Sequence, residues 1–311
     1  MIECLGSGVS FGDFDNDGWT DLFVSCDSAP NILYHNNGNG TFTDIGLVSG
    51  TALNEDGIEQ AGMGVAVGDY NQDGRPDILV TNFSDETSTL YQNDSGGVFT
   101  DSTYHAGLGY DTKYVSWGTG LVDLDNDGWK DIFIVNGHVY PQVDQHPSEI
   151  TYRQSPLVYR NLRNSTFRNV SAEAGPGVSK EHASRGAAFA DFDKDGDLDV
   201  IITNLNDSPS LLQNESVNNN NWLSVRLEGH RSNRSGIGAR IQINSGDLVQ
   251  IDEVRSASSY YSSNGLAVHF GLGLSKQVEQ LEILWPSGTQ QRFKNIQAGQ
   301  VVTVHESKGI Q

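Results

Sequence analysis

The chain is poor in basic residues, and this shortage excludes two kinds of partner. Its 311 residues contain 19 Lys and Arg against 40 Asp and Glu, which gives a formal net charge of −21. Non-specific binding to nucleic acid or to an anionic membrane surface depends on basic patches. The composition therefore predicts that the protein binds neither.

Long apolar runs and a leader sequence are also missing. No stretch approaches the roughly 18 apolar residues that a transmembrane helix needs, so no membrane insertion is expected. Residues 1–4 lead straight into the first predicted strand, without a signal peptide or a preceding hairpin. We interpret the chain as the C-terminal part of a longer protein. The two cysteines, Cys4 and Cys26, are compatible with a disulfide or with free thiols.

One nine-residue pattern occurs four times, with oxygen-bearing side chains at positions 1, 3, 5 and 9 and Gly at position 6. Hard cations such as calcium take six to eight oxygen ligands, and Gly allows the tight turn around the ion. At position 7 the backbone carbonyl would complete each site, in Trp19, Arg75, Trp129 and Asp197. The predicted Ca²⁺ side-chain ligands are Asp13, Asp15, Asp17 and Asp21; Asp69, Asn71, Asp73 and Asp77; Asp123, Asp125, Asp127 and Asp131; and Asp191, Asp193, Asp195 and Asp199.

Two other interpretations of the pattern fit less well. Asp, Asn and Gly also mark ordinary turns. Four copies in the same register, however, would each concentrate mutually repelling carboxylates with no cation to offset the repulsion. An EF-hand carries a bidentate Glu at position 12 between two helices. Position 12 is apolar in all four copies, as Val24, Val80, Ile134 and Ile202, so a helix-loop-helix hand is excluded.

The segments around each loop predict β-strands. The loops start 56, 54 and 68 residues apart, a period typical of propellers. A Gly-rich apolar stretch precedes each loop, and two short runs rich in β-branched and aromatic residues follow it. A Gly/Asn-rich turn and a fourth strand close the first three units, as in 36–44. We predict an all-β protein: four four-stranded propeller blades in residues 1–217, forming a partial ring, then a small β-rich domain in residues 218–311.

The unit Gly-x-Gly-x-x-x-Asp-x-Asp-x-Asp-Gly-x-x-Asp resembles the FG-GAP or VCBS repeats of integrin α-chain propellers and of many secreted bacterial proteins. The resemblance covers residues 1 to about 217. It implies calcium binding, an extracellular, cell-surface or periplasmic location, and closed rings of about seven blades, of which four are visible here.

The C-terminal third has no Asp loop and resembles the ASPIC/UnbV domain. The resemblance depends on the phrases 222–229, 232–240, 269–273 and 283–288, where alternating apolar residues also indicate half-buried strands. This resemblance says little about mechanism, because the biochemical role of the ASPIC/UnbV domain is poorly defined.

Three classes of function stay open. The first is a non-catalytic, calcium-stabilised scaffold for adhesion or protein contact, with an extracellular protein or glycan as partner. The second is a carbohydrate-binding propeller, although Arg75 and Asp197 interrupt the pattern set by Trp19 and Trp129. The third is an enzyme that uses the long loop with His138, Asp144 and His146. No nucleophile elbow, Walker loop or dinucleotide fingerprint is present in a strand-helix context, so no catalytic residue is predicted.

Overall fold

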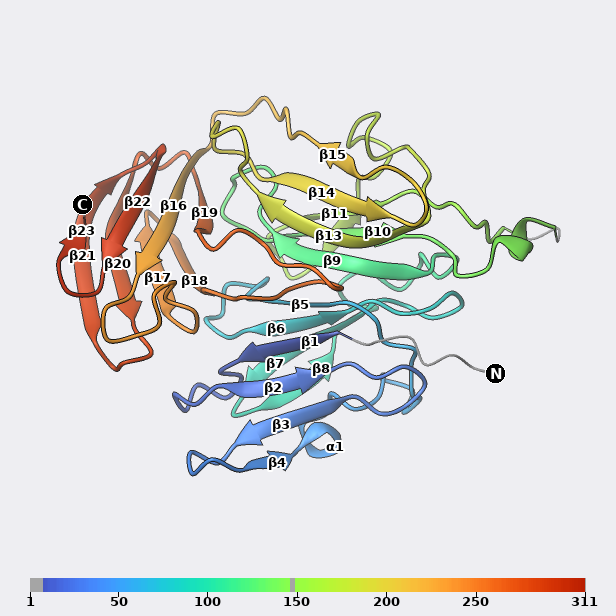
Figure 1. Cartoon of the computed structure of the whole chain (residues 1–311), viewed down its shortest axis with the longest axis horizontal. Helices are drawn as coiled ribbons and strands as arrows, with labels where there is room; N and C mark the ends of the chain where they lie inside the picture. The colour runs from blue at the N-terminus through green and yellow to red at the C-terminus, as the bar shows by residue number, and fades with distance from the viewer. Residues whose placement is uncertain (1–7, 146–148, 311) are drawn as a thin grey trace.

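The structure is a computed structural model that describes residues 8–145 and 149–310, and these residues form almost only strands. Four antiparallel sheets follow one another from the N-terminus, and two further sheets lie beside them (Figure 1). The prediction of an all-β protein is confirmed. In the described residues the helices are one turn, α1 (Gly46–Ser49), and a 3₁₀ segment, η1 (Pro141–Gln145). None is long and apolar enough to cross a membrane.

The four sheets are the predicted blades, each with its strands in sequence order. Blade 1 contains β1 (Val9–Gly12), β2 (Asp21–Val24), β3 (Ile32–Asn36) and β4 (Phe42–Asp44). Blade 2 contains β5 (Val65–Gly68), β6 (Asp77–Val80), β7 (Thr89–Ser95) and β8 (Val98–Asp101). Blade 3 contains β9 (Ser116–Val122), β10 (Asp131–Asn136), β11 (Leu157–Asn161) and β12 (Phe167–Asn169), and blade 4 contains β13 (Ser184–Ala190), β14 (Asp199–Asn204) and β15 (Ser210–Leu212).

The prediction of four strands holds for blades 1 to 3 and is wrong for blade 4, which has three. After β15 the chain does not turn back along the blade. It runs through the Asn-rich stretch 218–221 into the first strand of the C-terminal domain.

Neighbouring blades pack through alternating residues of their strands, because successive side chains point to opposite faces of a sheet. We call the face that looks toward the next blade the leading face, and the opposite one the trailing face. Between blades 1 and 2 the buried leading-face residues are Phe14, Phe23 and Leu33, and the buried trailing-face residues are Val65, Ile78, Val80 and Tyr91. Equivalent clusters join blade 2 to blade 3 and blade 3 to blade 4.

A glycine five residues before each loop lets the innermost strands approach closely. A Cβ at Gly8 would overlap the carbonyl of Met63, one at Gly64 that of Trp117, and one at Gly118 the backbone of Arg185 and Ala187. Each of these contacts joins a blade to the next one. These glycines therefore lie where the innermost strands of neighbouring blades approach most closely.

In blades 2 to 4, an Asn at or near the end of the third strand ties the blade to the preceding one. Asn161 Nδ2 donates to the carbonyl of Lys130 in its own blade and to that of Tyr70 in the preceding blade, both at 2.9 Å. Asn93 and Asn214 form the same pair of bonds, with Phe14 and Leu124 as the cross-blade acceptors. Asn36 of blade 1 reaches only Thr20 of its own blade.

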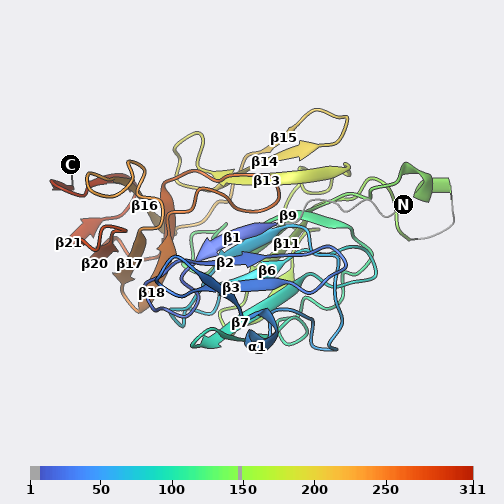
Figure 2. The ribbon, with the colours of Figure 1, turned by 60° about the horizontal axis from the view of Figure 1, so that its bottom comes forward.

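The C-terminal domain is a sandwich of two four-stranded sheets around an apolar core that contains Trp285 and Phe270. One sheet has the order β19 (Val268–Gly273), β16 (Asn221–Glu228), β22 (Gln300–His305) and β23 (Gly309–Ile310), with β16 and β22 parallel. The other has the order β18 (Leu248–Glu253), β17 (Arg240–Ser245), β20 (Gln277–Leu284) and β21 (Gln290–Gln297). Figures 1 and 2 show the sandwich at one end of the blades, with the strands of blades 1 to 4 running toward it.

Between β18 and β19 the chain leaves the sandwich and runs along the innermost strands of the blades. In this central segment (255–267) Ser259 pairs with Val65, and its Oγ accepts a hydrogen bond from Thr119 N–H at 2.9 Å. A Cβ at Gly186 would meet Ser262 Oγ and the carbonyl of Tyr260. The central segment therefore lies beside Gly186 in the position that the next blade occupies beside Gly8, Gly64 and Gly118.

The cross-blade hydrogen bond should make Asn161 more important for stability than Asn36, which lacks that bond. Asn161→Ala removes one buried and one partly buried hydrogen bond and leaves two carbonyls without their donor, so we expect the free energy of unfolding to fall by about 2 kcal/mol. Asn36→Ala removes one partly exposed bond and should cost about 0.5 kcal/mol. Denaturant unfolding of both variants measures the difference. Equal losses would show that the cross-blade bond adds nothing.

Candidate metal centres

The four Asp loops lie between the first and second strands of their blades, and all four turn in the same way. The Gly at position 6 has a positive φ in each, between 84° at Gly74 and 98° at Gly196. That conformation is easily adopted only by glycine, which explains its recurrence. The loops are therefore four copies of one backbone structure.

The turns bring the predicted carboxylates together in three of the four loops. Single oxygen atoms lie within 4.8 Å of one another in three sets: Asp13, Asp15 and Asp21; Asp123, Asp125 and Asp127; and Asp191, Asp193 and Asp199. A fourth set joins Asp15 and Asp17 to His35 of β3. In loop 2 Asn71 replaces the carboxylate at position 3, and its remaining acidic groups form no such set among the described residues.

Backbone N–H groups hold these side chains in place. The carboxylate at position 1 accepts from the amide at position 6, as from Gly18 to Asp13 at 3.0 Å, in all four loops. The carboxylate at position 9 accepts from the amide at position 2 and from the third-strand Asn. The latter bond, such as Asn161 N–H to Asp131 Oδ1, is 2.8 Å in every blade. The ligand positions are thus fixed by the fold itself.

Burial makes the negative charge of these groups costly without a cation. It raises the pKa of Asp131 to about 8 and those of Asp21 and Asp69 to about 6. Burial also raises the pKa of Asp123 well above its ordinary value, and the nearby charges of Asp131 and Asp127 add to the effect. A divalent cation in the loop would reverse the balance, because an opposite charge favours the ionised carboxylate.

One atom of loop 3 offers a direct test of whether the residues fit a metal ion. Asp125 Oδ1 is buried and has no hydrogen-bond partner among the described residues. Buried polar atoms in folded proteins almost always have a partner, and a bound ion is one of the accepted explanations when they do not. Asp125 itself belongs to the set with Asp123 and Asp127, and carboxylate oxygen is the ligand type that calcium prefers. The residues of loop 3 therefore fit a hard divalent cation.

Loop 2 carries an internal cation instead of a fourth carboxylate. Arg75 Nη2 pairs with Asp73 Oδ2 at 2.5 Å, while its Nε donates to the carbonyl of Asn93 at 2.6 Å. Asn71 Nδ2 also donates to Asp73 Oδ2, at 2.9 Å. In loop 3 the guanidinium groups of Arg160 and Arg163 pair with Asp125 and Asp127, and both arginine side chains are about half exposed.

The side chains at position 7 have different surroundings in the four loops. Trp19 is exposed and Trp129 half-buried, Arg75 pairs with Asp73, and Asp197 accepts from Asn126 Nδ2 at 2.7 Å. Their role as carbonyl ligands remains a prediction.

Sequence reasoning missed the third-strand Asn residues and the side chains next to them. His35 Nδ1 lies 3.1 Å from Asp15 Oδ2, Arg160 pairs with Asp125, and Gln213 Nε2 donates to Asp193 Oδ2 at 2.7 Å. The sequence contained a signal for these side chains, because His35, Arg160 and Gln213 each directly precede the Asn at or near the end of the third strand. Position 9 and this Asn are joined in every blade.

The sandwich lies directly on the loops, a contact that the sequence did not indicate. Arg240 donates to Asn16 Oδ1 of loop 1 and to the carbonyl of Gly74 of loop 2. His269 Nε2 lies 2.7 Å from Asn126 Oδ1 of loop 3, and burial lowers the pKa of this His to about 4. Gly196 of loop 4 leaves room for the indole of Trp222. All four loops therefore touch the C-terminal domain.

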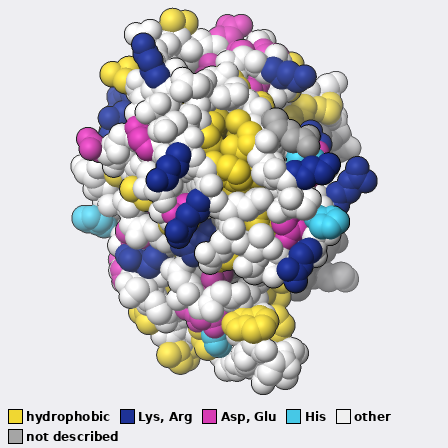
Figure 3. Space-filling view, turned by 90° about the vertical axis from the view of Figure 1, so that its left-hand side faces the viewer, with side chains coloured by type: hydrophobic (Ala, Val, Ile, Leu, Met, Phe, Trp, Pro, Cys, Tyr) yellow, Lys and Arg dark blue, Asp and Glu magenta, His cyan; other side chains and the backbone are white. Residues whose placement is uncertain are grey.

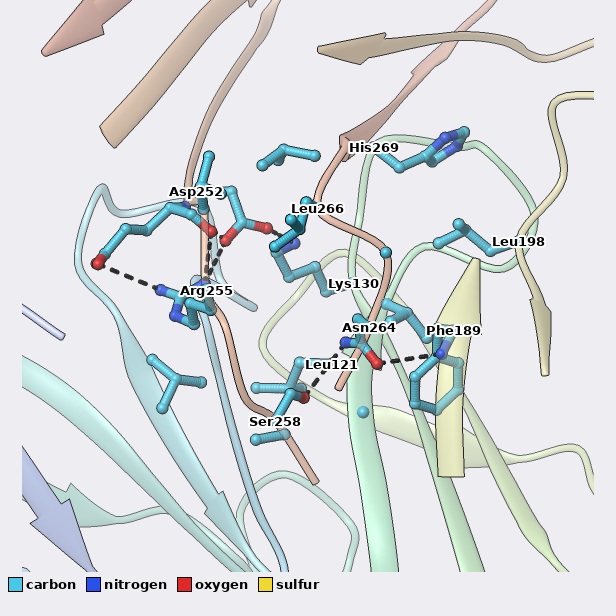
Figure 4. A pocket seen from close by; sticks show the side chains of 18 of the residues that line it. Leu121, Lys130, Phe189, Leu198, Asp252, Arg255, Ser258, Asn264, Leu266 and His269 are labelled. Carbon is cyan, nitrogen blue, oxygen red and sulfur yellow. Dashed lines mark hydrogen bonds and ion pairs between the residues drawn. The ribbon is translucent and has the colours of Figure 1, made fainter. Parts of the chain in front are cut away.

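A buried ion-pair cluster reinforces this contact (Figure 4). Asp252 of β18 pairs with Lys130, the residue after position 7 of loop 3, at 2.6 Å and with Arg255 at 2.5 Å. Burial alone would raise the pKa of Asp252, but these two cations hold it at about 2. Nearby, Asn264 Oδ1 accepts from Phe189 N–H at 3.1 Å and fixes the central segment to β13.

The other candidate residues do not form a metal site in the described part of the chain. His138 is buried against Phe83 and Tyr140, and its Nδ1 accepts from Tyr140 N–H at 3.0 Å. Asp144 Oδ1 accepts from Tyr152 N–H. His146 and Cys4 lie outside the described residues, so a site that includes His146 and a Cys4–Cys26 disulfide lie outside them too.

Blades, loops and sandwich together define a class of protein. Residues 13–80, 69–134 and 149–202 match the FG-GAP-like repeat, and residues 229–311 match the ASPIC and UnbV domain. The chain belongs to the FG-GAP-like repeat family and ends in an ASPIC/UnbV domain. It is 29% identical to cartilage acidic protein 1 of Homo sapiens over 97% of this chain and 44% of that protein. The Mus musculus protein is 30% identical over 91% of this chain and 42% of its own length. The chain thus spans less than half of these relatives.

Two solved structures are similar at a low level. A lectin from Agrocybe aegerita, described for its recognition of non-reducing terminal N-acetylglucosamine, aligns with a TM-score of 0.34 at 19% identity, over 66% of this chain and 51% of its own. A mutant of AofleA from Arthrobotrys oligospora aligns with a TM-score of 0.35 at 9% identity, over 97% of this chain and 76% of its own. These scores carry no argument about ligands.

A reciprocal exchange at position 3 should move calcium affinity between loops 2 and 3. Asn71→Asp adds a carboxylate to loop 2, and Asp125→Asn removes one from loop 3, so we expect affinities about tenfold higher and about tenfold lower at these loops. In the unchanged chain, loop 2 should empty first. Native mass spectrometry across a series of free calcium concentrations counts the ions retained per chain. Identical emptying curves for the chain and both variants would contradict the assignment.

The raised carboxyl pKa values predict how pH changes the effect of calcium. Without metal, the folded state holds its carboxyl protons more tightly than the unfolded state, so stability is lost as pH rises through about 6 to 8. With calcium, protons compete for the same oxygens. The difference in Tm between calcium-loaded and metal-stripped protein should therefore shrink from pH 8 to pH 5. Melting curves at both pH values check this, and a difference that grows at pH 5 would refute it.

Proposed function

We propose that this chain is a calcium-stabilised, non-catalytic scaffold that acts outside the cytoplasm, at the cell surface or in the extracellular or periplasmic space. Its role is to present blade and sandwich surfaces to a protein or glycan partner in adhesion. Calcium binds in the four Asp loops and stabilises the end of the blades on which the sandwich lies. The observation that carries the proposal is that all four loops touch the C-terminal domain.

The arrangement of the loops supports a structural role for the metal. All predicted side-chain ligands of a site come from one nine-residue segment. The carboxylates at positions 1 and 9 already accept hydrogen bonds from backbone N–H groups. A catalytic metal instead keeps an open position for water or substrate. A cation enclosed between a blade and the sandwich neutralises buried charge and holds the two domains together.

Two other functions are supported less well. A carbohydrate-binding propeller would expose equivalent aromatic residues on successive blades, but the position-7 residues are an exposed Trp19, a half-buried Trp129, Arg75 and Asp197. An enzyme centred on the long loop of blade 3 would need His138 accessible, whereas this side chain is buried and hydrogen-bonded to the backbone.

Removal of calcium should loosen the sandwich from the blades before either domain unfolds. At millimolar calcium and affinities of roughly 10⁻⁴–10⁻³ M, each site contributes about 1 kcal/mol, and magnesium should substitute poorly. We expect faster amide exchange in β17 to β19 after metal is stripped, with little change in β20 and β21. Hydrogen–deuterium exchange with calcium, magnesium or no metal measures this. Equal exchange under all three conditions would rule the proposal out.

Adhesion itself needs a separate measurement. We expect cells of the source organism to attach to surfaces coated with the calcium-loaded chain, and attachment to fall when the metal is stripped. A glycan array run in parallel tests the carbohydrate alternative. Strong, calcium-independent binding of one glycan class would replace the adhesion proposal with the lectin function.

A further inference from the structure

Loop 1 differs from the other Asp loops because an imidazole lies beside its carboxylates. His35 Nδ1, on β3, lies 3.1 Å from Asp15 Oδ2. A nitrogen of this ring and one oxygen each of Asp15 and Asp17 all lie within 4.8 Å of one another. Asp21 Oδ1 is 3.4 Å from His35 Nδ1, but it already accepts from Asn36 N–H at 2.8 Å. Among the described residues, the corresponding sets of loops 3 and 4 contain carboxylates alone.

The two carboxylates of this set are held in place by their own loop. Asp15 Oδ1 accepts from Asp17 N–H at 3.1 Å, and Asp17 Oδ1 accepts from Trp19 N–H at 2.7 Å. These bonds engage the Oδ1 atoms, while Oδ2 of Asp15 lies beside the imidazole. The side chains of Asp15 and His35 are 19% and 29% exposed, and Asp17 is exposed. The set is therefore preorganised and accessible to ions from solvent.

The side chains at the position of His35 in blades 3 and 4 cannot act in the same way. Arg160 pairs with Asp125 at 2.6 Å, and Gln213 donates through Nε2 to Asp193 at 2.7 Å. A guanidinium has no lone pair to offer, and the nitrogen of an amide side chain is only a donor. A neutral imidazole has one nitrogen with a free lone pair and is a common metal ligand. This position therefore supplies a hydrogen-bond donor in blades 3 and 4 and a metal-ligating nitrogen in blade 1.

An imidazole nitrogen changes which cation a site prefers. Calcium and magnesium are hard ions that bind oxygen. Zinc takes both His nitrogen and Asp oxygen, at about 2.0–2.2 Å, and imidazole suits it well. In a tetrahedral site these bond lengths place two ligand atoms roughly 3.4 Å apart. The 3.1 Å between His35 Nδ1 and Asp15 Oδ2 is close to that separation.

We propose that loop 1 is a zinc site, with His35, Asp15 and Asp17 as its protein ligands. The inference rests on the metal-binding role that the proposed function gives to the Asp loops, and it assigns one of them a different ion. Calcium occupies loop 1 when zinc is absent, and Zn²⁺ displaces it because the imidazole favours the transition metal. The three other loops, which lack an imidazole ligand, keep calcium.

Native mass spectrometry of the calcium-loaded 311-residue chain, titrated with Zn²⁺, tests this assignment. We expect one calcium ion to be exchanged for one zinc ion per chain. His35→Gln keeps a hydrogen-bond donor, as Gln213 does in blade 4, but removes the ligand. It should lower the zinc affinity by about tenfold or more and leave the number of bound calcium ions unchanged. His182→Gln is the matched control, because His182 Nδ1 lies 3.2 Å from Asp207 outside the Asp loops, and it should not change zinc binding.

Cobalt(II) in place of zinc distinguishes a ligand from a nearby hydrogen-bond donor. Paramagnetically shifted imidazole protons should appear in the proton NMR spectrum of the chain and be absent from that of His35→Gln. Melting curves in calcium confirm that the variants fold. Zinc binding that His35→Gln leaves unchanged, or a spectrum without the shifted protons, would overturn the proposal. A chain that keeps its calcium but takes no zinc refutes the zinc site alone, whereas a chain that binds neither metal refutes the proposed function as well.

Discussion

Repulsion among buried carboxylates is the constraint on which the rest of this structure depends. Each blade has, between its first two strands, a loop that gathers three or four acidic or amide side chains, and the fold fixes them there with backbone hydrogen bonds. Burial raises the pKa of these groups, so their ionisation opposes folding unless positive charge is near. In loop 2 Arg75 supplies this positive charge, and in loop 3 Arg160 and Arg163 supply it.

The C-terminal domain adds positive charge beside the acidic blades. Residues 1–217 carry 33 of the 40 acidic residues but only 10 of the 19 basic ones, so the sandwich holds nearly half of the positive charge. Figure 3, which views the sandwich side of the molecule, shows Lys and Arg side chains spread over it around an exposed apolar strip. At the contact itself the pairing is specific, with Arg240 on loops 1 and 2 and Asp252 between Lys130 and Arg255. A cation in the loops and a domain on top of them reduce the same repulsion.

The sequence predicted the loops and the blades well because both depend on local spacing. Ligands at positions 1, 3, 5 and 9 and strands with alternating apolar residues lie within a few residues of one another, so their pattern is visible without the fold. The cross-blade Asn bonds and the contact between Asn16 and Arg240 join residues that are far apart in the chain, so no short-range pattern in the sequence predicts them. Blade 4 was mispredicted for a related reason: the strand it lacks depends on where the chain goes after Leu212, which local composition does not determine.

A series of identical blades contains no internal reason to stop, because each interface needs only its nearest neighbour. In this chain the C-terminal end is limited by two features: the chain leaves blade 4 after β15, and the central segment occupies the inner end of its leading face. In blade 1, Val9 and Phe11 are exposed at the register positions that Val65 and Val67 hold in blade 2. The repeat that creates the Asp loops thus also creates apolar blade faces, since one face of every blade must be apolar for the next blade to pack.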